Sequence, residues 1–155
     1  MRLLLQSLRT PEAQPTATEQ LAGFASRLRF EHLPAELITQ TKLSILDTIG
    51  VALAGAGIGE GCKQILDYAM SGGASGGSSI WSSGKRIPAP QAALANAAHA
   101  RALDYDDIIV FPQIHVAACV VPASLAVAQL ISSKLNGKNV IAAVALGCEV
   151  QSRLA

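Results

Sequence analysis

Apolar residues recur every three to four positions through most of this chain, and no segment shows the strict alternation of a half-buried strand. This periodicity predicts helices in six segments. Thr16 and Glu19 have the spacing of a capping box at the start of the first. Pro34 suits the first turn of the second, which Gly55 and Gly57 are expected to end. We therefore predict an all-α fold, with helices over residues 16–28, 34–55, 62–70, 89–103, 116–133 and 140–155.

One segment interrupts the helical pattern. Residues 71–90 consist mainly of Gly, Ser and Pro (SGGASGGSSIWSSGKRIPAP). Such a composition is typical of a flexible linker, but Ile80 and Trp81 form a small apolar island within it. Because burial of a large aromatic side chain is strongly favourable, we expect an ordered Gly/Ser-rich loop with a short extended piece.

The composition limits the class of protein. Of the 155 residues, 50% are hydrophobic and 15% are charged, which is too apolar a composition for a disordered chain. Twelve Lys and Arg against eleven Asp and Glu leave no excess of positive charge to neutralise phosphates, so nucleic acid is not an expected partner. The low charged fraction predicts an apolar surface, which favours self-association or a place in a larger assembly.

An uncharged stretch raises the question of a membrane span. Residues 108–133 contain no Asp, Glu, Lys or Arg. Pro112, His115 and Pro122 interrupt this stretch, and its dense apolar part is shorter than the roughly 20 residues that a span needs. We therefore expect a core helix with a kink or a late start near Pro122, and no membrane association.

The N-terminus and the cysteines bear on the compartment. Residues 1–10 (MRLLLQSLRT) contain two arginines and no acid, which allows a mitochondrial presequence, but a flexible tail over residues 1–15 is favoured. Cys62, Cys119 and Cys148 have neither CxxC nor CxxH spacing, so we expect no disulfide framework and no zinc site. The expected location is cytoplasmic, with the mitochondrial matrix as the alternative in a eukaryote.

Two glycine-containing segments resemble nucleotide-binding motifs without matching them. In residues 55–61 (GAGIGEG) the third glycine of a dinucleotide fingerprint falls on Glu60, whose charge would face the pyrophosphate. Residues 79–85 lack the first glycine of a P-loop. We therefore expect no nucleotide cofactor.

An acidic cluster is the most informative motif. Asp104, Asp106 and Asp107 stand together eleven residues before His115, which opens an apolar helix. Closely spaced carboxylates beside a histidine suit proton transfer. A solvated acid cluster at a helix end is the alternative, and a divalent metal held by Asp104, Asp106 and His115 is chemically possible.

Several segments, taken together and in order, are similar to one known family. They are residues 21–25, 42–55 (KLSILDTIGVALAG), 83–86, 92–107 (AALANAAHARALDYDD), 115–128 (HVAACVVPASLAVA) and 147–154. The LDYDD element, followed by a loop histidine and a VVPA helix, is the specific part of the pattern. On these motifs the chain resembles the N-terminal part of the MmgE/PrpD family, which includes 2-methylcitrate dehydratase and cis-aconitate decarboxylase.

The resemblance implies lyase chemistry on small polycarboxylates, by dehydration or decarboxylation, without an iron–sulfur cluster or other cofactor and without a metal. It implies a homodimer and a helical domain of which residues 16–155 are a part, the C-terminal part and a lid domain being absent. Asp104 and His115 match catalytic positions. Asp107, Lys85 and Arg86 are expected to bind the substrate, although capping of the loop remains an alternative for Asp107.

The chain also departs from the family pattern. Ile108 replaces a common threonine, Val116 a proline, and Ala97 a glycine, and Arg101 stands where many members have histidine. Family members are much longer, and their further histidine and lysines lie beyond the region that this chain matches. We therefore expect the chain alone to be inactive. The alternative is a truncated, non-catalytic helical protein that self-associates.

Overall fold

A computed structural model describes residues 14–73, 75–111 and 113–155. The predicted all-α fold is confirmed, since the described residues are mostly helical with one small sheet. The predicted tail over residues 1–15 lies, apart from Gln14 and Pro15, outside the described residues. The elements in order are α1 (Ala17–Arg27), η1 (Phe30–His32), α2 (Ala35–Ile58), α3 (Cys62–Ser71), β1 (Ser78–Ser79), β2 (Arg86–Ile87), α4 (Ala89–Arg101), α5 (Ala117–Leu130), η2 (Ser132–Lys134) and α6 (Gly137–Leu154).

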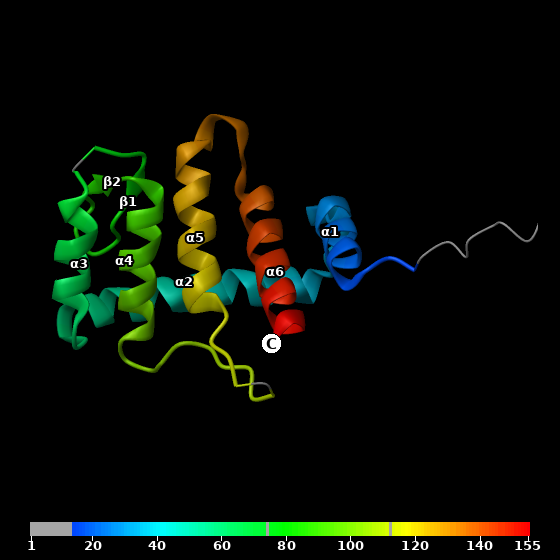
Figure 1. Ribbon diagram of the computed structural model, residues 1–155, viewed down its shortest axis with the longest axis horizontal. Coiled ribbons are helices and arrows are strands. Elements are labelled where there is room, and N and C mark those ends of the chain that lie inside the picture. The colour runs from blue at the N-terminus through cyan, green and yellow to red at the C-terminus, as the bar shows by residue number, and fades with distance from the viewer. Residues whose placement is uncertain (1–13, 74, 112) are drawn as a thin grey trace, which may run out of the picture.

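The helices form two layers (Figure 1). Helices α3, α4, α5 and α6 lie side by side, and α2 crosses behind all four and contacts each of them. Helix α1 stands beside α6 at the N-terminal end of α2. The predicted capping box is present at its start, where Glu19 N–H donates to the Thr16 hydroxyl and the Glu19 carboxylate accepts from Thr16 N–H.

Helix α2 is longer than predicted. Gly55 and Gly57 do not end it, and it continues to Ile58 with Gly59 as its C-cap. Gly55 is buried, and a Cβ placed on it would lie 2.0 Å from the carbonyl oxygen of His99 in α4. The glycine therefore serves the close approach of α2 to α4 rather than the end of the helix.

The Gly/Ser-rich loop is ordered where the structure describes it, as predicted. Strands β1 and β2 pair antiparallel within it. The Asn96 side chain of α4 bridges its backbone, because Nδ2 donates to the Ser79 carbonyl at 2.9 Å and Oδ1 accepts from Trp81 N–H at 3.0 Å. Ile80 is fully buried. The apolar island thus anchors the loop on α4.

Small side chains make up much of the core. Ala52, Ala100 and Ala118 come from α2, α4 and α5 and form one buried cluster, against which Trp81 packs. Alanine-to-alanine contacts let helix backbones approach closely, so this packing places the end of α4 near the start of α5. The loop between them carries the acidic cluster.

The uncharged stretch 108–133 divides into a loop and the 14-residue helix α5. Helix α5 starts at Ala117, close to the predicted start, and contains Pro122, so the expected late start near Pro122 does not occur. Its length is below that of a membrane span. Among the described residues, α2 is the one helix long and apolar enough to cross a membrane, and it packs against four other helices.

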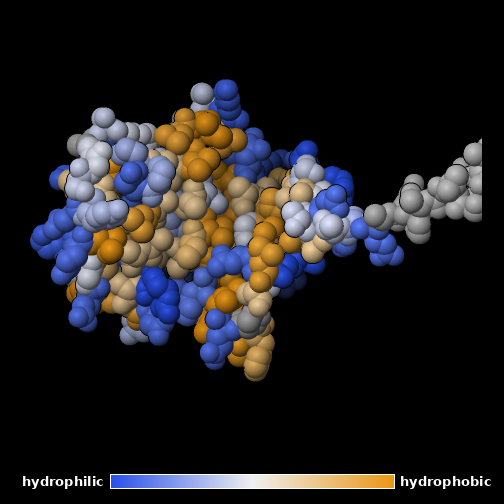
Figure 2. Space-filling model, in the orientation of Figure 1, coloured by the Kyte–Doolittle hydropathy of each residue, from blue (hydrophilic) through white to orange (hydrophobic). Residues whose placement is uncertain are grey.

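Exposed apolar side chains gather at several places on the face shown in Figure 2, and two of these places flank α5. One is the end of α5, where Leu130 and Ile131 are exposed, and the other is the loop below it, where Ile108, Val110 and Phe111 are exposed. Phe111 is 90% exposed. The loop that carries the acidic residues therefore has an apolar tip that faces solvent.

Candidate active site

The loop from residue 102 to residue 116 joins α4 to α5 and is held at both ends. At its start, Asp104 adopts a left-handed backbone conformation with φ of +57°, which is uncommon for a side-chain-bearing residue. At its tip, Ile109 and Ile114 exchange two backbone hydrogen bonds of 2.9 and 3.1 Å. At its end, Asp107 Oδ1 accepts from the N–H of Ala117, the first residue of α5. The loop therefore doubles back and brings its two arms together.

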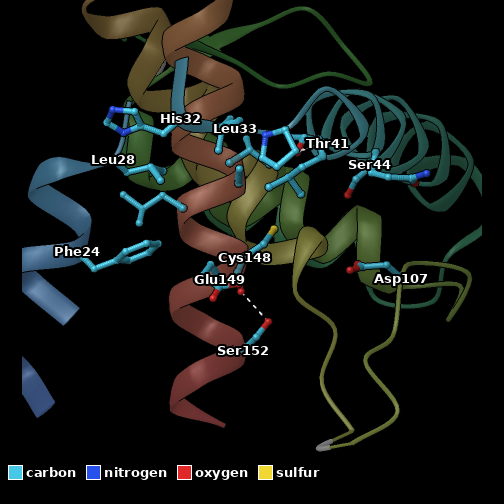
Figure 3. A pocket seen from close by; sticks show the side chains of 16 residues that line it. Phe24, Leu28, His32, Leu33, Thr41, Ser44, Asp107, Cys148, Glu149 and Ser152 are labelled. Atoms are coloured by element: carbon cyan, nitrogen blue, oxygen red, sulfur yellow. Dashed lines mark hydrogen bonds between the residues drawn. The ribbon is translucent and has the colours of Figure 1, made fainter. Parts of the chain in front are cut away.

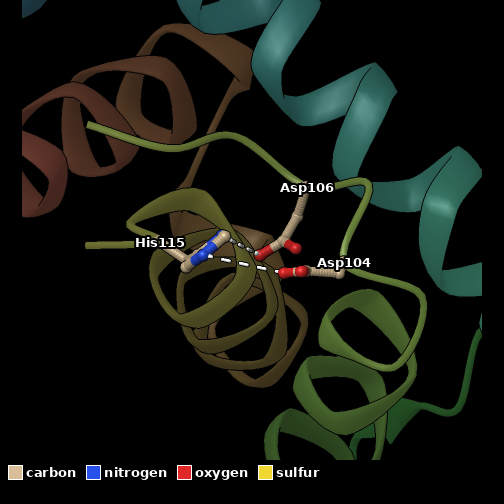
Figure 4. A group of neighbouring side chains, drawn as sticks. All are labelled: Asp104, Asp106 and His115. Carbon is tan, nitrogen blue, oxygen red and sulfur yellow. Dashed lines mark ion pairs between the residues drawn. The ribbon is translucent and has the colours of Figure 1, made fainter. Parts of the chain in front are cut away.

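This geometry brings the two predicted catalytic residues together (Figure 4). His115 Nε2 lies 3.8 Å from Asp104 Oδ1. His115 Nδ1 lies 3.2 Å from Oδ2 of Asp106, whose side chain is 1% exposed. The second pair is close but misaligned, so neither atom makes a hydrogen bond. One ring nitrogen thus faces an exposed carboxylate, and the other faces a buried one.

Arg101, the last residue of α4, supplies a positive charge to the same cluster. Its Nη1 donates to Asp104 Oδ1 at 2.5 Å and to Asp106 Oδ1 at 3.3 Å. The contact with Asp104, followed by that with Asp106, raises the pKa of the guanidinium, which stays charged at all accessible pH values. One guanidinium therefore holds both aspartates that face His115.

Asp107, predicted to bind substrate, caps α5 by accepting from Ala117 N–H. Burial raises the pKa of its carboxyl, the hydrogen bond from Ala117 N–H opposes that rise, and the charge of Asp106 adds to it. Asp107 also lines a cavity of about 580 Å³ between α1, α2 and α6 (Figure 3). The hydrogen bond from Ala117 N–H is a capping contact of the kind that the alternative interpretation of Asp107 expects.

Lys85 and Arg86, also predicted to bind substrate, lie elsewhere. Arg86 pairs with Ser79, and the Ser79 backbone N–H bonds the Gln129 side chain near the end of α5. His115 precedes the opposite end of α5, roughly 18 Å away at 1.5 Å per helical residue. The Arg86 guanidinium donates to the Gly77 carbonyl, farther still from the loop. The structure does not bring these two cations to Asp104 and His115.

The cavity that Asp107 lines is mostly apolar. Phe24, Leu28 and Leu37 form much of its wall, and Glu149 and Ser152 of α6 add polar atoms (Figure 3). Asp104 and His115 are not among its lining residues. The pair thus converges at the protein surface rather than inside this cavity.

One potential ligand atom from each of Asp104, Asp106 and His115 lies within 4.8 Å of the others, a spacing that a metal ion could use. One oxygen of Asp104, Oδ1, already accepts from Arg101. A cation bound there would have to displace the guanidinium or tolerate its charge. Arg101 therefore already supplies a positive charge to this cluster.

Sequence reasoning missed two members of the cluster. Arg101 was noted only as a departure from the family histidine, although it stands three residues before Asp104 on a helix end. Asp106 was considered only as one of three possible metal ligands and was given no catalytic or positioning role. Because Asp106 stands among other acids in the chain, the sequence does not indicate which of their side chains is buried, and the fold shows that it is Asp106.

The chain is similar to one protein family and to several curated proteins that share one name. The family described as the MmgE/PrpD N-terminal domain matches residues 19–155. Cis-aconitate decarboxylase of Mus musculus is 30% identical over 142 residues, which cover 90% of this chain and 29% of that protein. The Homo sapiens protein of the same name is 30% identical over 88% of this chain and 29% of its own length. That of Aspergillus terreus is 27% identical over 92% of this chain and 29% of its own length. The chain thus spans about 29% of the length of these curated relatives.

Proposed function

This chain belongs to the MmgE/PrpD family, and on that premise we propose that it forms the proton-transferring part of a lyase active site for small polycarboxylates. The names of its relatives favour decarboxylation of the cis-aconitate type. Dehydration of a 2-methylcitrate-like substrate is the other reaction expected from the family resemblance.

The observation that carries the proposal is the convergence of Asp104 and His115, whose Oδ1 and Nε2 lie 3.8 Å apart. In a decarboxylation, a C–C bond breaks, carbon dioxide leaves, and the electron pair left on carbon takes up a proton. In a dehydration, a base removes a proton from carbon and an acid protonates the departing hydroxyl. An imidazole at a loop surface, beside a carboxylate, suits either role.

The charge of the cluster does not favour binding of a polycarboxylate substrate by this chain alone. Two carboxylates, those of Asp104 and Asp106, contact one guanidinium and one imidazole, and the carboxyl of Asp107 is adjacent in the chain. A polycarboxylate substrate would be repelled by this balance unless further cations were supplied. We propose that those cations come from the part of a longer protein that the relatives have and this chain does not span, and that the chain alone is inactive.

A chimaera tests the proposal. Residues 19–155 replace the matched region of the mouse cis-aconitate decarboxylase, and consumption of cis-aconitate and 2-methylcitrate is followed by NMR. We expect turnover of cis-aconitate by the chimaera and none by the chain alone. His115→Gln and Asp104→Asn in the chimaera are each expected to lower kcat by a factor on the order of 10² to 10⁴.

The control is a charge change at the other predicted substrate residues. Lys85→Met and Arg86→Met each remove one positive charge far from the cluster, and we expect little change in KM. A chimaera that is folded, with a cooperative thermal transition, but turns over neither substrate would contradict the proposed function. A large rise in KM for Arg86→Met would instead support the original assignment of that residue.

A second candidate function has its own observation. Leu43, Leu46 and Leu53 are exposed on α2, with Gly50 and Gly57 completing a 3-4-3-4 spacing. This is the spacing of a helix-pairing seam. Nothing lies within 4 Å of a Cβ placed on either glycine. Two antiparallel copies crossing at Gly50 would set each Leu43 into the space at Gly57, so we propose self-association of the chain through α2.

Light scattering after size exclusion tests this second candidate. We expect a dimer for the wild-type chain and a monomer for Leu46→Lys, because a lysine in an apolar seam is costly to desolvate. Leu130→Lys is the matched control, since Leu130 is similarly exposed but lies at the end of α5. A monomeric wild-type chain at millimolar concentration would exclude the α2 dimer.

A further inference from the structure

The two ring nitrogens of His115 face two carboxylates that differ greatly in exposure (Figure 4). Its Nδ1 is 3.2 Å from Asp106 Oδ2 and its Nε2 is 3.8 Å from Asp104 Oδ1. The Asp106 side chain is 1% exposed, whereas that of Asp104 is 74% exposed. One ring nitrogen therefore faces the protein interior, and the other faces the open side of the loop.

The interior contact decides where a neutral imidazole carries its proton. A neutral ring has one N–H, and the neighbour of each nitrogen determines which one holds it. Asp106 Oδ2 and His115 Nδ1 are both buried and make no hydrogen bond to any other described residue. Without a proton on Nδ1, two lone pairs would face each other at 3.2 Å. With that proton, a small rotation of the ring gives a charge-assisted hydrogen bond.

Arg101 keeps the Asp106 carboxylate in the orientation that this hydrogen bond needs. Its Nη1 lies 3.3 Å from Asp106 Oδ1, which leaves Oδ2 for the ring. The same Nη1 donates to Asp104 Oδ1, so the two carboxylates lie next to each other on one side of the imidazole (Figure 4). Both carboxylates that face the ring therefore accept hydrogen bonds from one guanidinium at the end of α4.

We propose that Asp106 is a positioning residue that keeps the proton of neutral His115 on Nδ1 and leaves the lone pair of Nε2 facing Asp104 and the open side of the loop. The buried carboxylate of Asp106 does not touch the substrate. Its part in the reaction rests on the proposed function, in which Nε2 exchanges a proton with the substrate. The tautomer itself is a property of the folded chain and needs no turnover.

Nitrogen NMR of the imidazole rings tests the tautomer in the full 155-residue chain. The chain has three histidines, and the His115 signals are identified by their loss in His115→Gln. At a pH where His115 is neutral, we expect its Nδ1 to give the protonated signal and its Nε2 the unprotonated one. In Asp106→Asn we expect the preference to be lost or inverted, because the asparagine amide can donate to Nδ1.

Asp107→Asn is the matched control, because it removes the same charge one residue away and keeps an oxygen for Ala117 N–H. We expect it to leave the His115 tautomer unchanged. A wild-type spectrum with the proton on Nε2 would overturn the proposal even if Asp106→Asn failed to fold. So would an unchanged tautomer in Asp106→Asn, or an equal change in Asp107→Asn.

Metal binding is the competing explanation, and the same samples test it. Stoichiometric binding of Zn²⁺ or Mn²⁺ to the wild-type chain, abolished by both His115→Gln and Asp106→Asn, would overturn the proposal in favour of a metal site. In an active chimaera, Asp106→Asn is expected to lower kcat by up to about 10⁴ while KM stays nearly constant. An inactive chimaera together with the predicted tautomer would refute the lyase function and leave the positioning role of Asp106 intact.

Discussion

Gly55 marks the closest approach of α2 to α4, and a single methyl group there is expected to destabilise the fold. A Cβ on Gly55 would lie 2.0 Å from the His99 carbonyl oxygen, whereas real Cβ atoms essentially never come within 3.0 Å of another atom. The two helices would have to separate by at least 1.0 Å. Because the obstacle is backbone, no change of side-chain rotamer relieves the overlap.

The magnitude follows from two opposing effects. Overpacking a core costs about 1–3 kcal/mol, and a backbone clash belongs at the upper end. Alanine is favoured over glycine within a helix by about 1 kcal/mol. Gly55→Ala should therefore lower the free energy of unfolding by about 2 kcal/mol, which for a chain of this size lowers Tm by roughly 4–8 °C.

Urea unfolding followed by circular dichroism measures this change. Gly50→Ala and Gly57→Ala are matched controls on the same helix when all chains are measured as monomers, since nothing in the chain lies within 4 Å of a Cβ at either position. Each should raise stability by about 0.5–1 kcal/mol. A Gly55→Ala chain as stable as Gly50→Ala would refute the packing of α2 against α4 described above.

Three further predictions concern titration and capping. Burial lowers the pKa of His99, and a backbone hydrogen bond with Cys62 opposes this shift. The unfolded chain therefore takes up a proton at higher pH than the folded chain, so the free energy of unfolding should fall as pH drops below about 6.5. Urea titrations between pH 8 and pH 5 should show this slope, and His99→Gln should reduce it. Burial and then Asp107 raise the pKa of Cys148 to about 11, so brief iodoacetamide treatment at pH 8 should label exposed Cys119 well before Cys148; equal labelling by mass spectrometry would contradict this. The Asn136 side chain caps α6 by accepting from Asn139 N–H, so Asn136→Ala should cost about 1 kcal/mol of unfolding free energy, and an unchanged urea midpoint would count against the cap.

The helices could be predicted because each has its own apolar periodicity and end signals. Thr16, Pro34 and the turn before α6 mark starts that depend only on local chemistry. The end of α2 could not be predicted, because Gly55 has the composition of a helix stop while its actual role depends on α4, which lies more than thirty residues later. Local signals cannot report such a long-range contact.

Some residues of the candidate site could likewise be predicted from local sequence, and others depend on long-range contacts. Asp104 and His115 are recognisable from the spacing of the LDYDD element and the loop histidine. The roles of Asp106 and Arg101 depend on which side chain is buried when the loop doubles back, which the sequence does not state. Lys85 and Arg86 were expected near the substrate through the family resemblance, and in the structure Arg86 pairs with Ser79, whose N–H donates to Gln129 near the opposite end of α5.

The crossing of α2 behind the other helices has a consequence for synthesis on the ribosome. Its contacts with α6 join segments separated by about 80 residues of intervening chain, from Ile58 to Gly137. At about 5–20 residues per second, the nascent helix would wait roughly 4–16 s before its last partner emerged. During that interval its apolar surface is available to neighbouring nascent chains and to chaperones, so the translation rate of the second half of the message should influence how much protein reaches the native state.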